Sequence, residues 1–352
     1  MKIGRPLIMK IVHFESGLGN QMLNYAEFLA IKYNYSDVYS EKLVYETAPK
    51  GLGFSQWNGY ELKKDFALNI PDIKDVLSKE QYSFIKSEMI SSKYWENDWK
   101  YAIPFISAMN KLGQNIYNFC DRGTFGSKEK HGLPEKWLKW LCFHTSLGNK
   151  IYLRLAKKNS QSLITKNYKN LFIEYPQDFY CGQTLKFMYK GQGIEKIEEK
   201  LKTTLIFQNI TLKNKEFAKF LHDSNSVSIH VRRGDFLSRN NFCYKYGFFK
   251  RSVEFMKKQL TSPILFVFFC SQEDIPWVKN NKKTFGLDNS DHIIFVDWNT
   301  NENSYQDMFL MSNCNNNIIT QSSFGWWGAW LNNNPNKISI SPDPRINTTH
   351  WM

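Results

Sequence analysis

The chain has 352 residues, more than one hydrophobic core usually supports, so we expect two domains, at residues 1–205 and 206–352. A formal net charge of +13 suits nucleic acid, an anionic membrane surface or a phosphorylated substrate, but the lysines are scattered and there is no arginine-rich tract or zinc-finger spacing, which argues against nucleic acid. The six cysteines form no Cys-x-x-Cys pair, no apolar run is long enough to span a membrane and no signal-peptide core is evident, so we expect a reducing cytoplasm.

The first predicted elements are a strand, a glycine-containing turn and a helix. Residues 10–14 are strand-like, residues 15–21 contain Gly17 and Gly19, and apolar residues then recur at helical spacing as far as Tyr33. The full dinucleotide fingerprint is absent, because a third glycine and a later ribose-binding acid are missing. The turn still predicts a loop whose backbone can approach a ligand closely.

The middle of the chain, residues 40–200, is rich in aromatic residues and lysine and carries no motif. Residues 195–205 predict a charged amphipathic helix near the domain junction, with charges that are solvated.

A strand that ends in two arginines follows at residues 227–236. Val227, Ile229 and Val231 alternate as β-branched strand residues, and Arg232-Arg233-Gly234-Asp235 comes directly after them. Ligands of open α/β sheets bind at the carboxyl ends of strands, and a guanidinium group matches phosphate oxygens with two parallel hydrogen bonds. The motif alone is equally compatible with a phosphate site and with a surface Arg-Asp pair.

From Ser226 onwards, short apolar runs alternate with helical stretches, which is typical of a parallel sheet. We expect strands at 227–231, 264–270, 293–297, 318–320 and 338–340, and helices at 248–260, 274–285, 302–314 and 326–332.

A second strand-to-helix turn favours the phosphate interpretation. Ser322 and Ser323 follow the strand-like residues 317–320 and open a helix. A helix amino terminus has unsatisfied N–H groups and partial positive charge, which attract anions. The three tryptophans of this segment are expected in the core, with one of them a candidate for contact with a sugar or base.

These three segments closely resemble the inverting α-1,2-fucosyltransferases of bacterial surface polysaccharide synthesis and their animal relatives, glycosyltransferase family 11. The resemblance covers residues 10–35 and 225–342 and lies in three motifs: Gly17-Leu18-Gly19-Asn20-Gln21-Met22, His230-Val231-Arg232-Arg233-Gly234-Asp235 and Ser323-Phe324-Gly325-Trp326-Trp327-Gly328-Ala329-Trp330-Leu331. Segments 273–279 and 307–312 lie between them in the family's order. The chain departs from the family pattern at Gly325, where serine is usual, at Ser16, where a glycine is usual, and at the acidic pair Glu273-Asp274, which follows an extra Gln272.

The resemblance implies an α/β fold of the GT-B type, with two facing Rossmann-like domains. It implies an acceptor-side domain at 1–205, a GDP-fucose-binding domain at 206–352, and transfer of L-fucose to the 2-hydroxyl of a terminal galactose. Animal relatives carry a membrane anchor, so its absence here leads us to expect a bacterial enzyme of the cytoplasm, associated at most peripherally with the inner membrane.

Breaking the glycosyl-phosphate bond requires fixed positive charge beside the departing diphosphate. No Asp-x-Asp and no His/Cys cluster is present, so we expect arginine to supply that charge and neither a metal nor a cofactor to be needed. Arg232 is the first candidate, with Arg233 supporting its geometry or the acceptor side. Asp235 either takes the acceptor proton or orients the arginines.

The resemblance also implies a set of donor contacts. His230 and Asp307 would meet the guanine or ribose, Ser322 and Ser323 the phosphates, and the remaining candidates would lie near them: Gly17, Gly19, Asn20, Glu273, Asp274 and Phe324.

Two other interpretations remain open. Another nucleotide-sugar transferase of the GT-B type, with α-1,6 or protein-O specificity, would also carry paired arginines, although the tryptophan-rich segment argues against it. A noncatalytic binding protein for a sugar or nucleotide could keep the same loops, and GDP release would distinguish it from an enzyme.

Overall fold

The structure is a computed structural model that describes residues 9–49, 58–97, 99–119, 141, 145–148, 150–151, 154, 170–182 and 186–352, without the side chains of Asp235 and residues 238–240. The described residues form two compact units. Among the described residues, the first unit contains those of 9–119, 170–187 and 191–206, and the second contains 141, 145–148, 150–151, 154, 188–190 and 207–352. The domain boundary expected near residue 205 stays a prediction.

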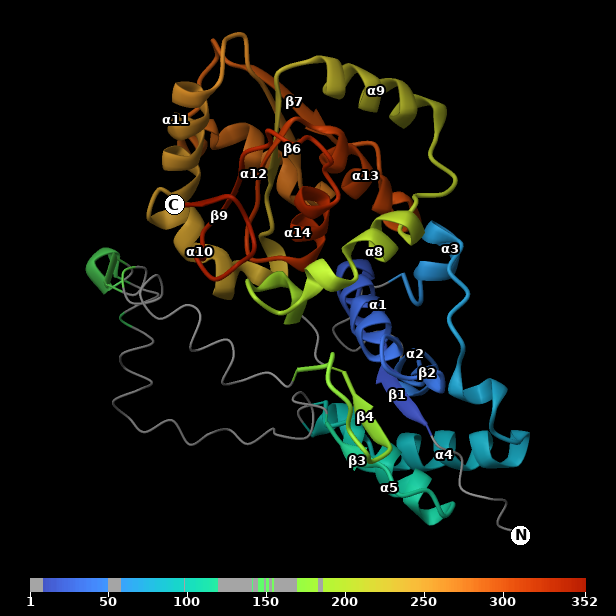
Figure 1. The fold of residues 1–352 in the computed structure, drawn as a ribbon. Helices are drawn as coiled ribbons and strands as arrows, with labels where there is room; N and C mark the ends of the chain where they lie inside the picture. The colour runs from blue at the N-terminus through green and yellow to red at the C-terminus, as the bar shows by residue number, and fades with distance from the viewer. Residues whose placement is uncertain are drawn as a thin grey trace. The chain divides into compact units, whose positions relative to one another are not determined.

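The first unit is built on a parallel sheet with the strand order β2-β1-β4-β3 (Figure 1). Its strands are β1 (Lys10–His13), β2 (Val38–Glu41), β3 (Tyr117–Asn118) and β4 (Phe179–Cys181). Its helices are α1 (Leu18–Lys32), α2 (Val44–Thr47), α3 (Leu62–Phe66), α4 (Lys79–Ser91), α5 (Ala102–Lys111) and α8 (Glu198–Thr204), with short 3-10 helices η1 (Ile73–Asp75), η2 (Tyr94–Glu96) and η4 (Ile194–Lys196).

The second unit is built on a larger parallel sheet with the order β10-β9-β8-β5-β6-β7. Its strands are β5 (Ser226–His230), β6 (Leu265–Phe269), β7 (His292–Val296), β8 (Asn316–Ile318), β9 (Ser339–Ser341) and β10 (His350–Trp351). Its helices are α9 (Leu212–Asp223), α10 (Leu237–Lys245), α11 (Phe248–Gln259), α12 (Ile275–Asn280), α13 (Tyr305–Asn313) and α14 (Ser323–Trp330). Its 3-10 helices are η5 (Gly234–Phe236), η6 (Gln272–Asp274), η7 (Lys282–Phe285) and η8 (Asn301–Asn303). A further 3-10 helix, η3 (Lys186–Met188), contains the sequence boundary between residues 187 and 188 at which the chain passes from the first unit to the second.

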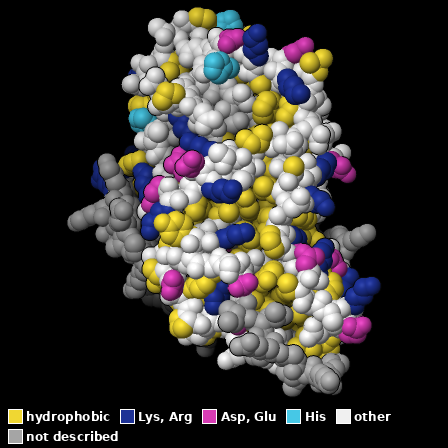
Figure 2. Space-filling model, turned by 45° about the vertical axis from the view of Figure 1, so that its right-hand side comes forward, with side chains coloured by type: hydrophobic (Ala, Val, Ile, Leu, Met, Phe, Trp, Pro, Cys, Tyr) yellow, Lys and Arg dark blue, Asp and Glu magenta, His cyan; other side chains and the backbone are white. Residues whose placement is uncertain are grey.

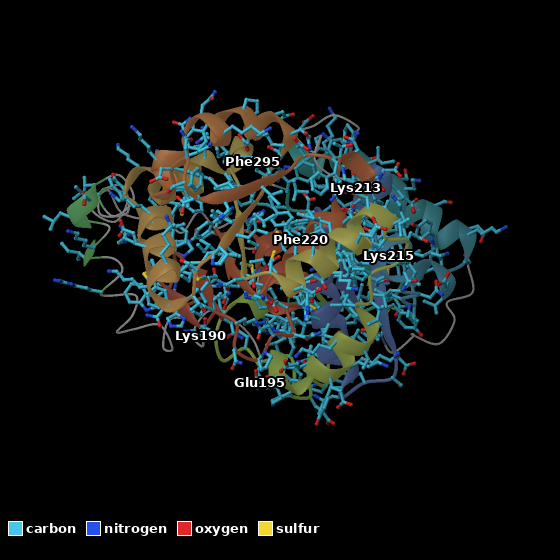
Figure 3. The ribbon with its side chains drawn as sticks, turned by 90° about the horizontal axis from the view of Figure 1, so that it is seen from above. Lys190, Glu195, Lys213, Lys215, Phe220 and Phe295 are labelled. Carbon is cyan, nitrogen blue, oxygen red and sulfur yellow. The ribbon has the colours of Figure 1, made fainter. Side chains whose placement is uncertain are left out.

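Helices cover both faces of the second sheet because side chains alternate along each strand. On β6, Phe266 and Phe268 pack with α10 and α11, whereas Val267 and Phe269 pack with α9 and α13. In Figure 3, the labelled residues Lys213, Lys215 and Phe220 lie on α9, and the labelled Phe295 lies on β7. The predicted α/β class, with a parallel sheet in each unit, is therefore confirmed, and the facing arrangement of the units stays a prediction.

Several predicted element boundaries were wrong: the helix expected at 274–285 is split into α12 and η7, and the strand expected at 318–320 is β8 at Asn316–Ile318. Two further errors are instructive. The helix after the glycine turn begins at Leu18, not after residue 21, because Gly17 is its amino-terminal cap and its carbonyl accepts from the amides of Asn20 and Gln21 at 2.9 and 3.2 Å. The last helix begins at Ser323, three residues before the predicted start. In both places the helix starts where a backbone carbonyl, that of Gly17 or of Ser322, accepts the first helical hydrogen bond, and not at the first apolar residue of the periodic pattern.

The surface agrees with the scattered charge read from the sequence. On the face shown in Figure 2, Lys and Arg side chains lie among acidic and uncharged ones rather than in one patch. Within the described ranges, none of the helices has both the length and the apolar character needed to cross a bilayer.

Candidate functional site

The carboxyl edge of the second sheet gathers most of the predicted site residues. The strands are parallel, so the segments that follow β5, β6, β8 and β9 meet at one edge. His230 ends β5, the acidic pair Glu273-Asp274 follows β6, and Ser322 follows β8.

His230 is a buried, neutral imidazole at this edge. Burial, together with the nearby Arg232 guanidinium, lowers its pKa from 6.5 to about 3. Its Nδ1 shares a hydrogen bond of 3.3 Å with the hydroxyl of Thr320, and its ring stacks on Phe324 with centroids 5.9 Å apart. The predicted donor residues His230 and Phe324 are thus in contact, and a neutral ring can both donate and accept a hydrogen bond.

Gly325 explains one departure from the family pattern. A Cβ atom at this position would lie 2.5 Å from His230 Nδ1 and 2.9 Å from its Cγ, which is closer than real Cβ atoms approach other atoms. The usual serine would therefore collide with the imidazole, and glycine allows α14 to pack directly on it.

Arg232 follows β5 in the loop held by Tyr244. The Tyr244 hydroxyl donates to the Arg232 carbonyl at 3.0 Å, Gly234 takes a left-handed φ of 41°, and the Arg232 guanidinium carbon lies 5.1 Å from the centre of the Phe236 ring. The side chain is half-buried. The loop thus fixes the backbone that carries the guanidinium.

Arg233 has a different environment from Arg232. Its guanidinium carbon lies 3.5 Å from the centre of the Trp277 ring and 5.1 Å from that of Tyr244, and its Nε is 3.5 Å from Asp274 Oδ1. Asp274 also accepts from the Ser271 hydroxyl at 2.9 Å. Arg233 and Asp274, which were predicted to have separate roles, therefore contact each other, whereas the neighbouring Glu273 is exposed.

Asp307 is buried on the first turn of α13. Burial raises its pKa from 3.8 to about 8, opposed by the hydrogen bond of 2.8 Å that Asn299 Nδ2 donates to it. Asn299 in turn contacts Asn214, which donates to Gln306 at 2.6 Å. Near neutral pH this carboxyl is mostly protonated, so it can donate a hydrogen bond to a ligand. Sequence reasoning missed Asn299, which lies eight residues before Asp307, and Asn214, which α9 brings here from a distant segment.

We expect Asp307→Asn to change how the thermal stability depends on pH. Folded Asp307 keeps its proton up to about pH 8, whereas the unfolded chain loses it near pH 4, so this group makes the folded state less stable as pH rises through that window. Asparagine removes the proton exchange but keeps the oxygen that accepts from Asn299. The melting temperature of the variant should therefore rise relative to that of wild type as the pH increases from 5 to 8. Asp297→Asn, at an exposed carboxyl, is the control; curves of Asp307→Asn parallel to wild type would contradict the raised pKa.

The amino terminus of α14 carries the two predicted phosphate-binding serines. Ser322 is the buried cap residue, its side chain makes no capping hydrogen bond, and Ser323 begins the helix. Trp326 and Trp327 of the same helix are fully buried, as expected for core residues.

Sequence reasoning missed a third arginine at this edge. Arg345 donates through Nε at 2.9 Å to Oδ1 and through Nη2 at 2.6 Å to Oδ2 of Asp343, a buried carboxylate just after β9. The only signal in the sequence is the pair Asp343-x-Arg345, which is common in surface turns.

The glycine loop lies in the first unit, at the carboxyl end of β1. Ser16 has a φ of 67°, a conformation that glycine adopts more readily, which accounts for the family's usual glycine at this position. The Tyr45 hydroxyl donates to the Ser16 carbonyl at 2.7 Å and secures the turn. Gly19 and the half-buried Asn20 therefore lie in the first turn of α1, not in a loop.

The side chain of Asp235, the candidate base, lies outside the described residues, and its role stays a prediction. In the described part of the chain, no three His, Cys, Asp or Glu side chains are grouped so that they could hold a metal ion.

A parallel sheet whose carboxyl edge presents arginines, a neutral histidine and a helix amino terminus defines an α/β protein suited to an anionic, nucleotide-like ligand. The model of glycosyl transferase family 11 matches residues 143–344, more than half of the chain. The chain therefore belongs to this family.

Individual relatives are similar over shorter stretches. The chain is 38% identical over 152 residues to an alpha-1,2-colitosyltransferase of Escherichia coli, a match that covers 42% of this chain and 50% of that protein. It is 27% identical over 113 residues to the galactoside 2-alpha-L-fucosyltransferase SEC1 of Bos taurus, covering 31% and 29%. The chain thus spans half or less of the length of these curated relatives. Among solved structures, the fucosyltransferase NodZ from Bradyrhizobium is similar with a TM-score of 0.42 and 11% identity, covering 92% of each chain.

Proposed function

We propose that this protein is a galactoside α-1,2-fucosyltransferase, which moves L-fucose from GDP-β-L-fucose to the 2-hydroxyl of a terminal galactose with inversion. The observation that carries the proposal is the arrangement at the end of β5, where Arg232 follows a neutral His230 that is packed on α14. Membership of family 11 and the similarity to a galactoside 2-alpha-L-fucosyltransferase support the choice of reaction.

In the proposed reaction, Arg232 stabilises the charge that develops on the departing diphosphate. The amides at the start of α14, with Ser322 and Ser323, hold the same phosphates. His230 and the protonated Asp307 donate to and accept from the guanine or ribose, because both are uncharged near neutral pH. Gly17, Gly19 and Asn20 are proposed as further donor-binding residues.

Arg233 is proposed as a positioning residue. The contacts with Trp277 and Asp274 engage its guanidinium, which supports a role in fixing the loop that carries Arg232. Asp274 then acts through Arg233, and Glu273 stays a candidate for a direct donor contact. Asp235 keeps both proposed roles, as a base or as a partner of the arginines.

The cellular setting is proposed as the synthesis of a bacterial surface glycan such as an O-antigen or lipopolysaccharide. The similarity to an Escherichia coli colitosyltransferase supports it. The acceptor would be a galactose-ended oligosaccharide or glycolipid at the cytoplasmic face of the inner membrane, and the net charge of +13 would favour peripheral attraction to anionic lipid.

A second donor is favoured by one specific observation, the 38% identity to an alpha-1,2-colitosyltransferase. Colitose is fucose without the 3-hydroxyl group. A site that hydrogen-bonds that hydroxyl rejects the deoxy sugar strongly, whereas an apolar site accepts both, so the two donors are distinguishable by rate.

The test is an assay of the purified protein with GDP-fucose or GDP-colitose and a panel of galactose-ended oligosaccharides. We expect GDP release that depends on the acceptor, NMR signals of an α-linked fucose at the galactose 2-hydroxyl, and a rate unchanged by EDTA. Binding of GDP-fucose without turnover would support a noncatalytic protein. A β-fucoside or another linkage would overturn the assignment, and loss of activity on chelation, restored by a divalent metal, would overturn the arginine mechanism.

A further inference from the structure

We infer that the pair Asp343–Arg345 sets the phosphate-binding turn at the start of α14: Asp343 holds the turn through Gln321, and Arg345 compensates the charge of that carboxylate. The inference rests on the proposed function, in which this turn carries the phosphate contacts. Asp343 and Arg345 would be positioning residues, because they act on the phosphates through the turn. All of these residues belong to the second unit.

The register of the second sheet brings Gln321 and Asp343 together. β8 and β9 are neighbouring parallel strands in which Ile318 and Ile340 are partners. Gln321 and Asp343 each follow one of these partners by three residues, so both lie just beyond the carboxyl edge of the sheet. The side-chain amide of Gln321 donates from Nε2 to Asp343 Oδ2 at 3.3 Å. The residue before the cap of α14 is thereby tied to the loop that follows β9.

Arg345 supplies further hydrogen bonds to the Asp343 carboxylate. Its Nε donates to Oδ1 at 2.9 Å, its Nη2 donates to Oδ2 at 2.6 Å, and its backbone amide donates to Oδ1 at 2.9 Å. The Asp343 side chain is 1% exposed, whereas that of Arg345 is 26% exposed. A planar guanidinium that binds both oxygens orients a carboxylate more tightly than one contact does. Asp343 is therefore held in one orientation, in which Oδ2 faces Gln321.

The loop after β9 contacts α14 at a second point. The fully buried Trp326 donates from Nε1 to the carbonyl of Asn347 at 3.3 Å. The loop is itself braced, because the Ser341 hydroxyl donates to the Asp343 carbonyl at 2.8 Å. The first part of α14 is thus held by this loop through both Gln321 and Trp326.

An uncompensated carboxylate at this position would oppose phosphate binding. A helix amino terminus favours an anion, and Asp343 lies one side-chain contact away from the residue before the cap Ser322. Two anions beside the same helix end repel each other, and in a partly buried site the repulsion is only weakly screened. The guanidinium of Arg345 offsets the negative charge while the carboxylate keeps its hydrogen bonds. The pair can therefore shape the turn without repelling a diphosphate.

Stability alone does not account for a pair of this kind. Taking two charges out of water is costly, and replacing a buried ion pair by apolar residues is often neutral or stabilising. An Asp-x-Arg pair in an ordinary surface turn would leave its carboxylate in water, whereas Asp343 is buried. Its position beside the segment that opens α14 favours a role in the donor site.

The test measures the binding of GDP by calorimetry and the binding of guanosine, which lacks the phosphates, by NMR. Arg345→Ala leaves the buried Asp343 carboxylate without its guanidinium, and we expect the affinity for GDP to fall by about 10-fold or more with little change for guanosine. The double variant Arg345→Ala/Asp343→Asn should recover most of this loss, because it removes the negative charge. Arg345→Lys should recover part of it, because a point charge replaces the fork.

Two further variants keep the test decisive if Arg345→Ala is unstable. Gln321→Ala removes the tie to the turn without changing any charge, and it should lower the affinity for GDP by about threefold or more, again with little change for guanosine. Thr349→Val is the matched control on the same loop, where the Thr349 hydroxyl donates to the Ser339 carbonyl at 2.9 Å and accepts from the Ser339 amide at 2.7 Å. This control should lose melting temperature and keep its affinity for GDP.

The outcomes separate this inference from the proposed function. Wild-type affinity for GDP in both Arg345→Ala and Gln321→Ala would overturn the inference and leave a structural turn. Equal losses for GDP and guanosine would also overturn it, because the effect would then be a general loosening. A double variant as weak as Arg345→Ala would contradict the charge compensation. If the variants bind as expected but wild type forms no glycoside from any donor, the proposed function fails and the role of the pair stands. If wild type binds no GDP, both proposals fail.

Discussion

Arg232→Ala should lower the rate of sugar transfer by about 100-fold or more, by comparison with the loss of one oxyanion donor in other enzymes. The lost guanidinium would stabilise charge mainly as the diphosphate departs, so kcat should fall more than the affinity for GDP. The melting temperature should change little, because the side chain is half-buried and its cation–π contact with Phe236 is worth about 1 kcal/mol.

Two further variants sharpen this result. Arg232→Lys should recover only part of the rate, because a point charge replaces a planar fork. Arg233→Ala should lower the melting temperature as well as the rate, because Trp277 and Asp274 lose their partner. Near-normal turnover in Arg232→Ala would remove this residue from the mechanism, and identical behaviour of the two alanine variants would contradict their separate roles.

Gly325→Ala should weaken GDP binding more than the addition of a single methyl group would suggest. The added methyl group would lie 2.5 Å from His230 Nδ1, and the imidazole is buried, so either the ring or α14 must shift. Overpacking of this kind costs about 1–3 kcal/mol. If this cost destabilises the arrangement of His230 that binds GDP, each 1.4 kcal/mol raises the dissociation constant about tenfold. We expect the affinity for GDP, measured by calorimetry, to fall by about 10-fold or more.

Gly328→Ala is the matched control, because it lies on the same helix and gains the same helix propensity. Its added Cβ would lie 2.3 Å from the flexible end of Met311, Cε, and 2.9 Å from Met311 Cβ, on α13, and would not meet His230. This variant should lose melting temperature but keep its affinity for GDP. Equal losses of affinity in both variants would show that α14 acts only as a packing element, and normal affinity in Gly325→Ala would remove His230 from the donor site.

The sequence by itself determined the local elements and the composition of the sheet edges. Alternation along residues 227–231 and 264–270 identified β5 and β6 within one residue at each end, because side-chain periodicity is a property of consecutive residues. The same local logic located Arg232, His230 and the serines of α14 at strand ends. It failed at the start of α1, where the left-handed Ser16 and the cap at Gly17 decide the boundary.

Only the tertiary structure decided what these residues contact and whether they carry charge. Arg233 meets Trp277 and Asp274 because β5 and β6 are neighbours in the sheet. Asp307 keeps its proton because burial raises its pKa more than the hydrogen bond from Asn299 lowers it. His13 and Glu41 are 28 residues apart and become a pair only through the register of β1 and β2. Burial and pairing across a sheet depend on how distant segments pack against each other. The periodicity of a single segment carries no information about that packing.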